Sequence, residues 1–279
     1  MSDEGKRRKP GGLRKPPAHE MSEPIPVIVR HPRQDSLWRR IGWHWRFQVV
    51  LRLVNRIQLR GVVLDVSPFP RDVKNVFYEG EYEAIECDFA ARYFSSQDRV
   101  LEVGGAVGFI GLFCLVHLGI KHYTVMEPNP KTAELLHRNY ALNDRTPSFL
   151  PFALGDRDGD VFLEVGSTFW GNSLIGATKG AKTIPVPGRR FATVLRQLDY
   201  SPTALIFDVE GAESLLNFAD IPVTVEKVLI ELHPKLLGPE ETSRILTDFE
   251  NLGFVVVEER NSVYFMARGK SVGSSGAVG

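Results

Sequence analysis

The stretch Val100-Leu-Glu-Val-Gly-Gly-Ala-Val-Gly108 decides the fold of this chain. Its apolar start is typical of a buried parallel strand, and the small residues after Glu102 predict a tight turn. The apolar pattern from Val107 to Leu118 then predicts a helix. Because glycine has no Cβ, such a turn lets the backbone approach a nucleotide-like ligand closely.

A second acidic residue, Glu127, follows nineteen residues after Gly108, at the end of the apolar segment Tyr123-Thr-Val-Met. A carboxylate at this place can accept hydrogen bonds from both ribose hydroxyls of an adenosine. The turn and the two carboxylates, on successive predicted strands, therefore predict a site for a nucleoside cofactor.

The details of the turn favour S-adenosylmethionine over NAD. A dinucleotide fold requires Gly-x-Gly-x-x-Gly, whereas this chain has Glu102-x-Gly104-x-Ala106-x-Gly108. The carboxylate of Glu102 would repel a pyrophosphate, but it suits the cationic sulfonium and ammonium groups of S-adenosylmethionine. We therefore expect this cofactor.

Composition limits the class of protein. The chain has 279 residues, of which 43% are hydrophobic and 24% charged, as in a soluble globular protein with one domain and an accessory segment. The 34 basic and 34 acidic residues balance, so no overall field indicates a nucleic-acid partner, and none is expected. Two cysteines, no secretory signal and no membrane-length apolar run predict a cytoplasmic location.

Four segments are expected along the chain. Residues 1–35 form a basic, Pro- and Gly-rich tail that predicts disorder, and residues 269–279 form a flexible small-residue tail. Residues 36–97 are expected to form a helical extension and linker, followed by a cofactor-binding domain over 98–268.

One long helix is predicted over 36–60 of the extension, and a linker over Ser67 to Asn75. The helix is rich in Arg and Trp, which raises peripheral membrane contact as an alternative. Arg52, Arg56 and Arg60 fall close to its apolar stripe, however, and this favours packing on the main domain.

From residue 99 on, strand and helix patterns alternate, which predicts a doubly wound, mostly parallel α/β sheet. Seven strands are expected at 99–104, 122–127, 148–153, 203–209, 226–232, 253–259 and 262–268. Helices are expected near 107–118, 130–142, 189–198, 211–218 and 239–251, and extra short strands at 160–165 and 182–187. The last two main strands are joined by a short turn, so they must pair as an antiparallel hairpin.

Seven motifs in this order resemble those of the FkbM-type S-adenosylmethionine-dependent methyltransferases, over roughly residues 78–235. They are Tyr78-Glu-Gly-x-Tyr-Glu83, Val100-Leu-Glu-Val-Gly-Gly-Ala-Val-Gly108, Glu127-Pro-Asn-Pro130, Asn139-Tyr-Ala-Leu-Asn143, Ala153-Leu-Gly-Asp156, Phe207-Asp-Val-Glu-Gly-Ala-Glu213 and Ile230-Glu-Leu-His-Pro234. The family usually has an Asp-Val-Gly-Ala-Asn turn, where this chain has Glu102-Val-Gly-Gly-Ala106. The missing Asn removes one polar contact to the cofactor.

The resemblance implies a Rossmann-like class I methyltransferase fold. It also implies cofactor roles for a set of five residues, which are Glu102, Gly104, Gly108, Glu127 and Asp156. Asp156 would lie just past the third strand and bond the adenine amino group, although Asp and Gly also favour an ordinary turn there.

The catalytic residues are expected at two further strand ends. Asp208 follows a buried strand, Glu210 lies one step further, and His233 ends the next strand. The ordinary pKa of a histidine suits a general base at neutral pH. Together with Glu231 these groups could bind a divalent cation, but Glu231 also suits a salt bridge, and no metal is expected.

The resemblance implies O-methylation of a hydroxyl on a small molecule or glycan, such as a sugar, a glycolipid or a polyketide-type metabolite. The long stretch from Glu164 to Gly188, which contains Trp170, could cover this acceptor. RNA or protein methylation, and a non-catalytic scaffold of the same fold, remain the alternatives.

Overall fold

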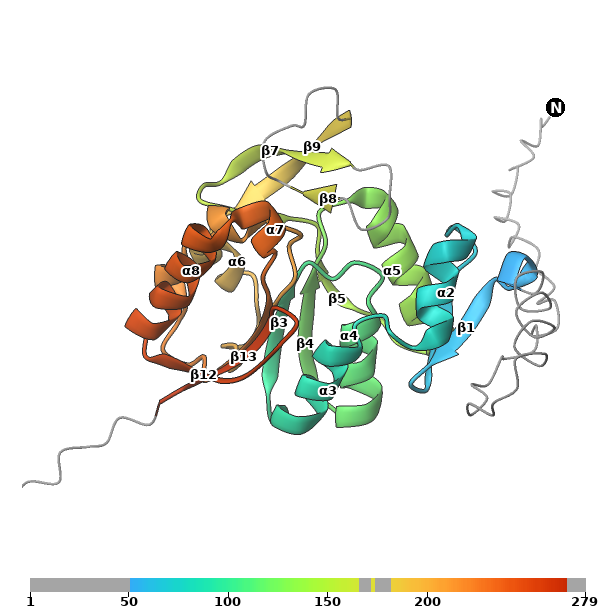
Figure 1. Cartoon of the computed structure of the whole chain (residues 1–279), viewed down its shortest axis with the longest axis horizontal. Coiled ribbons are helices and arrows are strands. Elements are labelled where there is room, and N and C mark those ends of the chain that lie inside the picture. The colour runs from blue at the N-terminus through green and yellow to red at the C-terminus, as the bar shows by residue number, and fades with distance from the viewer. Residues whose placement is uncertain (1–50, 166–171, 174–181, 270–279) are drawn as a thin grey trace, which may run out of the picture.

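The computed structural model describes residues 51–165, 172–173 and 182–269. Its centre is a seven-stranded sheet in the order β12-β13-β11-β10-β3-β4-β5 (Figure 1). The strands are β3 (Arg99–Val103), β4 (His122–Met126), β5 (Ser148–Leu150), β10 (Ala204–Phe207), β11 (Lys227–Glu231), β12 (Phe254–Arg260) and β13 (Val263–Arg268).

The pairing of these strands confirms the predicted fold. Strands β5, β4, β3, β10 and β11 are parallel to one another, and β13 is antiparallel to both β11 and β12. The chain is thus a Rossmann-like α/β protein with a mostly parallel seven-stranded sheet and the expected C-terminal hairpin. The strand order reverses between β3 and β10, which opens a crevice at their carboxyl ends.

Helices cover both faces of the sheet, which explains why its middle strand, β10, is apolar throughout. All four residues of β10 are buried. One face packs on α3 (Ala84–Tyr93), α4 (Phe109–Phe113), a π-helical turn (Cys114–Leu118) and α5 (Pro130–Leu142). The other packs on α6 (Phe191–Leu195), two 3-10 turns (Ala212–Leu215 and Phe218–Asp220), α7 (Pro234–Leu237) and α8 (Pro239–Asn251).

A second, smaller sheet lies across one end of the central strands (Figure 1). It has the order β6-β9-β7-β8, with strands β6 (Ala153–Leu154), β7 (Gly159–Val165), β8 (Asn172–Ser173) and β9 (Lys182–Arg189). Strands β7 and β9 confirm the short strands predicted at 160–165 and 182–187. Trp170 and most of the predicted acceptor-covering stretch lie outside the described residues.

The N-terminal extension differs from the prediction. Residues 51–53 are helical, but the predicted helix does not reach residue 60, because β1 (Arg56–Leu59) pairs with β2 (Val62–Asp65) as a hairpin. The predicted linker is correct over 67–70, which form no helix or strand, but wrong from Arg71 on, where α2 (Arg71–Glu79) begins. Residues 1–50 and 270–279, which include both predicted tails, lie outside the described part. Within that part, no helix is long and apolar enough to span a bilayer.

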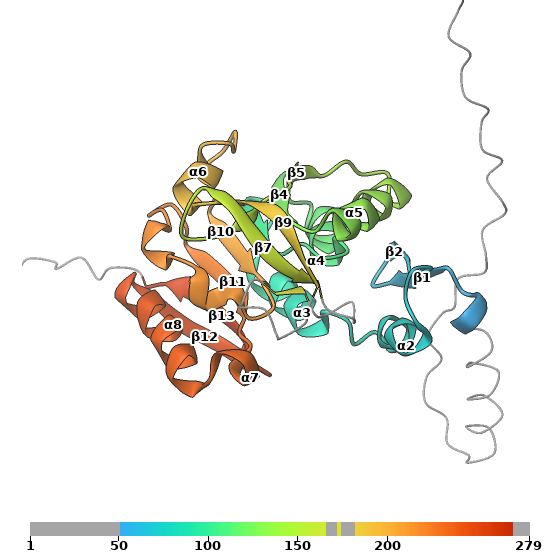
Figure 2. The ribbon, with the colours of Figure 1, turned by 90° about the horizontal axis from the view of Figure 1, so that it is seen from above.

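The hairpin lies beside α5 (Figure 2), and it is held by Asn139 of that helix and by Asn143 directly after it. The side chain of Asn143 accepts from the Val63 N–H at 2.9 Å and donates to the Val63 carbonyl at 2.7 Å, as a neighbouring strand would. Asn139 accepts from the Asp65 N–H at 2.8 Å and donates to the Val107 carbonyl at 2.9 Å. Asn139 therefore joins the N-terminal extension to the glycine turn.

Replacing Asn139 with alanine should lower the free energy of unfolding by about 1–3 kcal/mol for each buried group that loses its partner. Two such groups, the Asp65 N–H and the Val107 carbonyl, depend on a side chain that is 0% exposed. Urea unfolding of Asn139→Ala and of the exposed control Lys131→Ala on the same helix measures the difference. Equal losses in the two variants would contradict this role of Asn139.

Candidate functional site

A cavity of about 500 Å³ lies at the carboxyl ends of the central strands, where the topology predicts a crevice. Val103 and Gly104 reach it from β3, and Glu127 from β4. Leu154 and Leu163 of the smaller sheet form its opposite wall. Residues between α2 and α3 close a third side.

The cavity is strongly acidic. Among the described residues that line it there are seven carboxylates, one histidine and no Lys or Arg. The carboxylates belong to Glu81, Glu83, Glu86, Glu127, Asp208, Glu210 and Glu231. A concave site with one sign of charge concentrates ligands of the opposite sign, so this cavity favours a cationic group.

The glycine turn packs directly under the end of β10. Gly104 has φ +93°, and a Cβ at this position would lie 1.6 Å from the carbonyl oxygen of Asp208. Gly108 has φ +79°, and a Cβ there would lie 2.7 Å from the ring of Tyr140. Both positions therefore require glycine, but only Gly104 lines the cavity. Gly108 serves the packing of α4 on α5.

Glu127 lies where the sequence placed it, at the end of β4 and in the wall of the cavity. Its carboxylate accepts from the Ala106 N–H at 3.0 Å and from the Asn129 N–H at 2.8 Å. Burial raises the pKa of Glu127 to about 7, although these two N–H donors oppose the shift. The carboxylate thus spans the glycine turn and the start of α5.

Besides Gly108, two predicted cofactor residues lie away from the cavity, namely Glu102 and Asp156. Side chains alternate along a strand, so Val103 faces the cavity and Glu102 faces the helices. The Tyr123 hydroxyl donates to Glu102 at 2.9 Å, and burial raises the pKa of Glu102 to about 8. Asp156 is exposed in the bend after β6 and does not line the cavity. Neither residue contacts the cavity in this arrangement.

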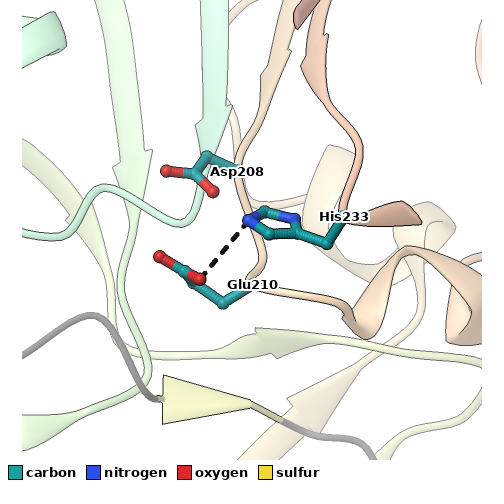
Figure 3. Close-up of side chains that lie close together, drawn as sticks. All are labelled: Asp208, Glu210 and His233. Atoms are coloured by element: carbon teal, nitrogen blue, oxygen red, sulfur yellow. Dashed lines mark ion pairs between the residues drawn. The ribbon is translucent and has the colours of Figure 1, made fainter. Parts of the chain in front are cut away.

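The three predicted catalytic residues do come together (Figure 3). Nε2 of His233 lies 3.3 Å from a carboxylate oxygen of Glu210. One ligand atom from each of these residues and from Asp208 lies within 4.8 Å of the others. Oδ1 of Asp208 is buried and has no hydrogen-bond partner in the described structure. The cluster could therefore receive a proton, a cation or a polar ligand group.

The charge of His233 differs from the expectation. Burial lowers its pKa, but the hydrogen bonds with Glu210 and Glu213 and the nearby Asp208 outweigh burial and raise the pKa to about 11. His233 is therefore an imidazolium at neutral pH, not the neutral base that its ordinary pKa suggests. Burial and the neighbouring Glu231 and Glu210 raise the pKa of Asp208 well above its usual range.

Sequence reasoning missed Glu83 as a cavity residue and left Glu231 as a salt-bridge partner. Glu83 has a buried oxygen without a partner, and burial raises the pKa of Glu231 to about 7. Seven non-glycine residues have positive φ in the described structure, and four of them line the cavity, namely Glu83, Ala106, Glu210 and Asn261. Backbone strain of this kind collects at functional sites.

No protein-family model matches the chain, and no curated protein matches it. Among solved structures it is similar to the ribosomal protein L11 methylase of Lactobacillus delbrueckii subsp. bulgaricus, with 11% identity, a TM-score of 0.43, and coverage of 68% of this chain and 80% of that one. It is also similar to the methyltransferase FkbM of Methylobacillus flagellatus KT, with 13% identity, a TM-score of 0.39, and coverage of 81% and 59%. M. jannaschii TYW2, solved in complex with AdoMet, has 13% identity, a TM-score of 0.39, and coverage of 76% and 83%. Similarity at this level does not by itself identify an activity.

Placing a methyl group on Gly104 should disrupt the site more than the same change at Gly155. The Cβ in Gly104→Ala would overlap the Asp208 carbonyl, whereas the Cβ in Gly155→Ala would meet nothing within 4 Å. We expect the first variant to lose more than about 3 kcal/mol in free energy of unfolding, since overpacking and positive φ each cost 1–3 kcal/mol. Chemical denaturation of the pair measures this, and two equally stable variants would contradict the packing described here.

Proposed function

We propose that this chain is an S-adenosylmethionine-dependent methyltransferase that methylates a hydroxyl of a sugar, glycolipid or polyketide-type acceptor. The observation that carries the proposal is the acidic cavity at the switch point of the sheet, with the glycine turn at its floor. A cationic nucleoside fits both the charge and the position of this cavity.

The residues of the cavity suit the two ends of that cofactor. Glu127 would accept the ribose hydroxyls, because its carboxylate lies at the end of β4 beside the turn. The buried, unpaired oxygen of Asp208 lies at the end of β10, on the other side of β3, where a cationic group would satisfy it. Adenosine on the β4 side and the sulfonium on the β10 side is the orientation that we propose.

Glu210 and His233 would carry out the acid–base chemistry. When bound, S-adenosylmethionine supplies a methyl group attached to a cationic sulfur. The acceptor oxygen would take this methyl group, and the sulfur would keep the electron pair of the broken C–S bond. The Glu210 carboxylate, in the cavity wall, would receive the hydroxyl proton. The imidazolium of His233, 3.3 Å from Glu210, would stabilise negative charge on the acceptor oxygen.

The same protonation argues for a reaction without a metal. A metal ligand must offer a lone pair, whereas Nε2 of an imidazolium carries a hydrogen. The carboxylates raise the pKa of His233 to about 11, so a cation that binds Nε2 at neutral pH must displace a proton. We therefore keep the expectation of no metal at Asp208, Glu210 and His233.

The acceptor class rests on the seven FkbM-like motifs. The cavity also bears on the alternatives, because its described lining has seven acidic side chains and no Lys or Arg to contact the phosphate backbone of RNA. The same carboxylates would attract an amino group, so protein methylation is the second candidate.

Calorimetric titration with S-adenosylmethionine and, separately, with NAD tests the proposal. We expect micromolar binding of S-adenosylmethionine and none of NAD, because the pyrophosphate of NAD would face the carboxylates of the cavity. Binding of NAD alone, or of neither compound, would contradict the proposed cofactor.

Within this test, Glu127→Ala should weaken S-adenosylmethionine binding by about 1.5–3 kcal/mol, the contribution of a hydrogen bond to a charged group. The matched control is Glu134→Ala, which removes an exposed carboxylate from α5 outside the cavity. If both variants bind as tightly as the wild type, the ribose does not lie on Glu127.

A further inference from the structure

Glu213 lies behind His233, on the side away from the cavity. It belongs to the 3-10 turn after β10, its side chain is 0% exposed, and it does not line the cavity. His233 follows β11, and 17% of its side chain is exposed. The imidazole ring thus stands between a buried carboxylate and the carboxylates of the cavity.

The two ring nitrogens of His233 face different partners. Nδ1 lies 2.8 Å from Oε1 of Glu213, and Nε2 lies 3.3 Å from Glu210. An ionised carboxylate can only accept, so with Glu213 ionised Nδ1 carries the hydrogen in this contact. This leaves Nε2 as the atom of the ring that faces the cavity.

A second contact fixes the carboxylate itself. Oε1 of Glu213 also accepts from the Gly211 N–H at 3.2 Å. Gly211 follows Glu210, and both residues have positive φ, at +50° for Glu210 and +91° for Gly211. Glu213 therefore contacts both the segment that carries Glu210 and the ring that pairs with Glu210.

We propose that Glu213 is a positioning residue, which holds the His233 ring with Nδ1 inward so that Nε2 is presented to Glu210 and to the acceptor. This inference rests on the proposed methyl transfer for its consequence in catalysis. The arrangement of ring and carboxylate is independent of that function and can be tested without an acceptor.

The buried carboxylate also determines the form that the ring takes if it loses a proton. With Nδ1–H bound to Glu213, the proton must leave from Nε2, toward the cavity. The other charged groups that act on the ring are Asp208, Glu210 and Glu231, all in the cavity wall. Glu213 is the one carboxylate of this group outside the cavity, so its effect is separable from that of a bound ligand.

Nitrogen-15 NMR of the imidazole rings in the full-length chain provides the test. His233 is one of seven histidines, and the spectrum of His233→Asn identifies its signals. In the wild type we expect both ring nitrogens to be protonated from pH 6 to about pH 9, with Nδ1 retaining its proton at higher pH. A ring that is neutral at pH 7, or that loses the proton from Nδ1, would overturn the proposal.

Glu213→Gln keeps the size of the side chain and an acceptor oxygen but removes the charge. We expect the titration midpoint of His233 to fall by about 1–3 pH units. Glu226→Gln, an exposed change before the start of β11, is the control and should leave the midpoint unchanged. If Glu213 only braced the 3-10 turn through Gly211, Glu213→Gln would leave the His233 titration as in the wild type.

Calorimetric titration of the same proteins with S-adenosylmethionine separates this inference from the proposed function. If the wild type does not bind S-adenosylmethionine, the proposed methyltransferase function is contradicted. The NMR result would still decide whether Glu213 positions the His233 ring. If Glu213→Gln does not fold, the protonation of the two ring nitrogens in the wild type alone decides whether Nδ1 is the nitrogen that is hydrogen-bonded to Glu213.

Discussion

The contact between the backbone of Gly104 and the carbonyl of Asp208 is the constraint on which the rest of the site depends. It joins the ends of β3 and β10 at the point where the strand order reverses. No side chain fits between them, so the glycine turn becomes the floor of a cavity whose wall begins at Asp208. The positions of Glu127 and Glu210 on opposite sides of this floor follow from that packing.

Electrostatics then determines what the cavity can hold. Burial raises the pKa values of Glu127 and Glu231 to about 7, and His233 is the one basic side chain in the described cavity wall. Carboxylates in this state hold protons until a cation replaces them. A positively charged cofactor would therefore bind and ionise the site in the same step, which connects the charge of the cavity to the proposed chemistry.

Much of this could be predicted from local patterns. Apolar runs ending in Glu127 and Asp208 predicted the strands, and parallel strand ends predicted that Asp208, Glu210 and His233 would meet. The direction of Glu102 follows from alternation along β3, which the motif-based expectation ignored. The raised pKa of His233 depends on its contacts with Glu210 and Glu213, which form only in the fold. The β1–β2 hairpin depends on Asn139 of α5 and on Asn143 directly after it. Such long-range partners have no local signal.

If the acidic side chains of the cavity ionise when a cation binds, binding must release protons. The most direct test is therefore to measure the number of protons released. S-adenosylmethionine would be titrated into the protein at pH 7 in two buffers that differ in ionisation enthalpy. With Glu127 and Glu231 each at a pKa of about 7, we expect net release of protons, because a bound cation lowers both pKa values. Binding without proton release, or with proton uptake, would contradict it.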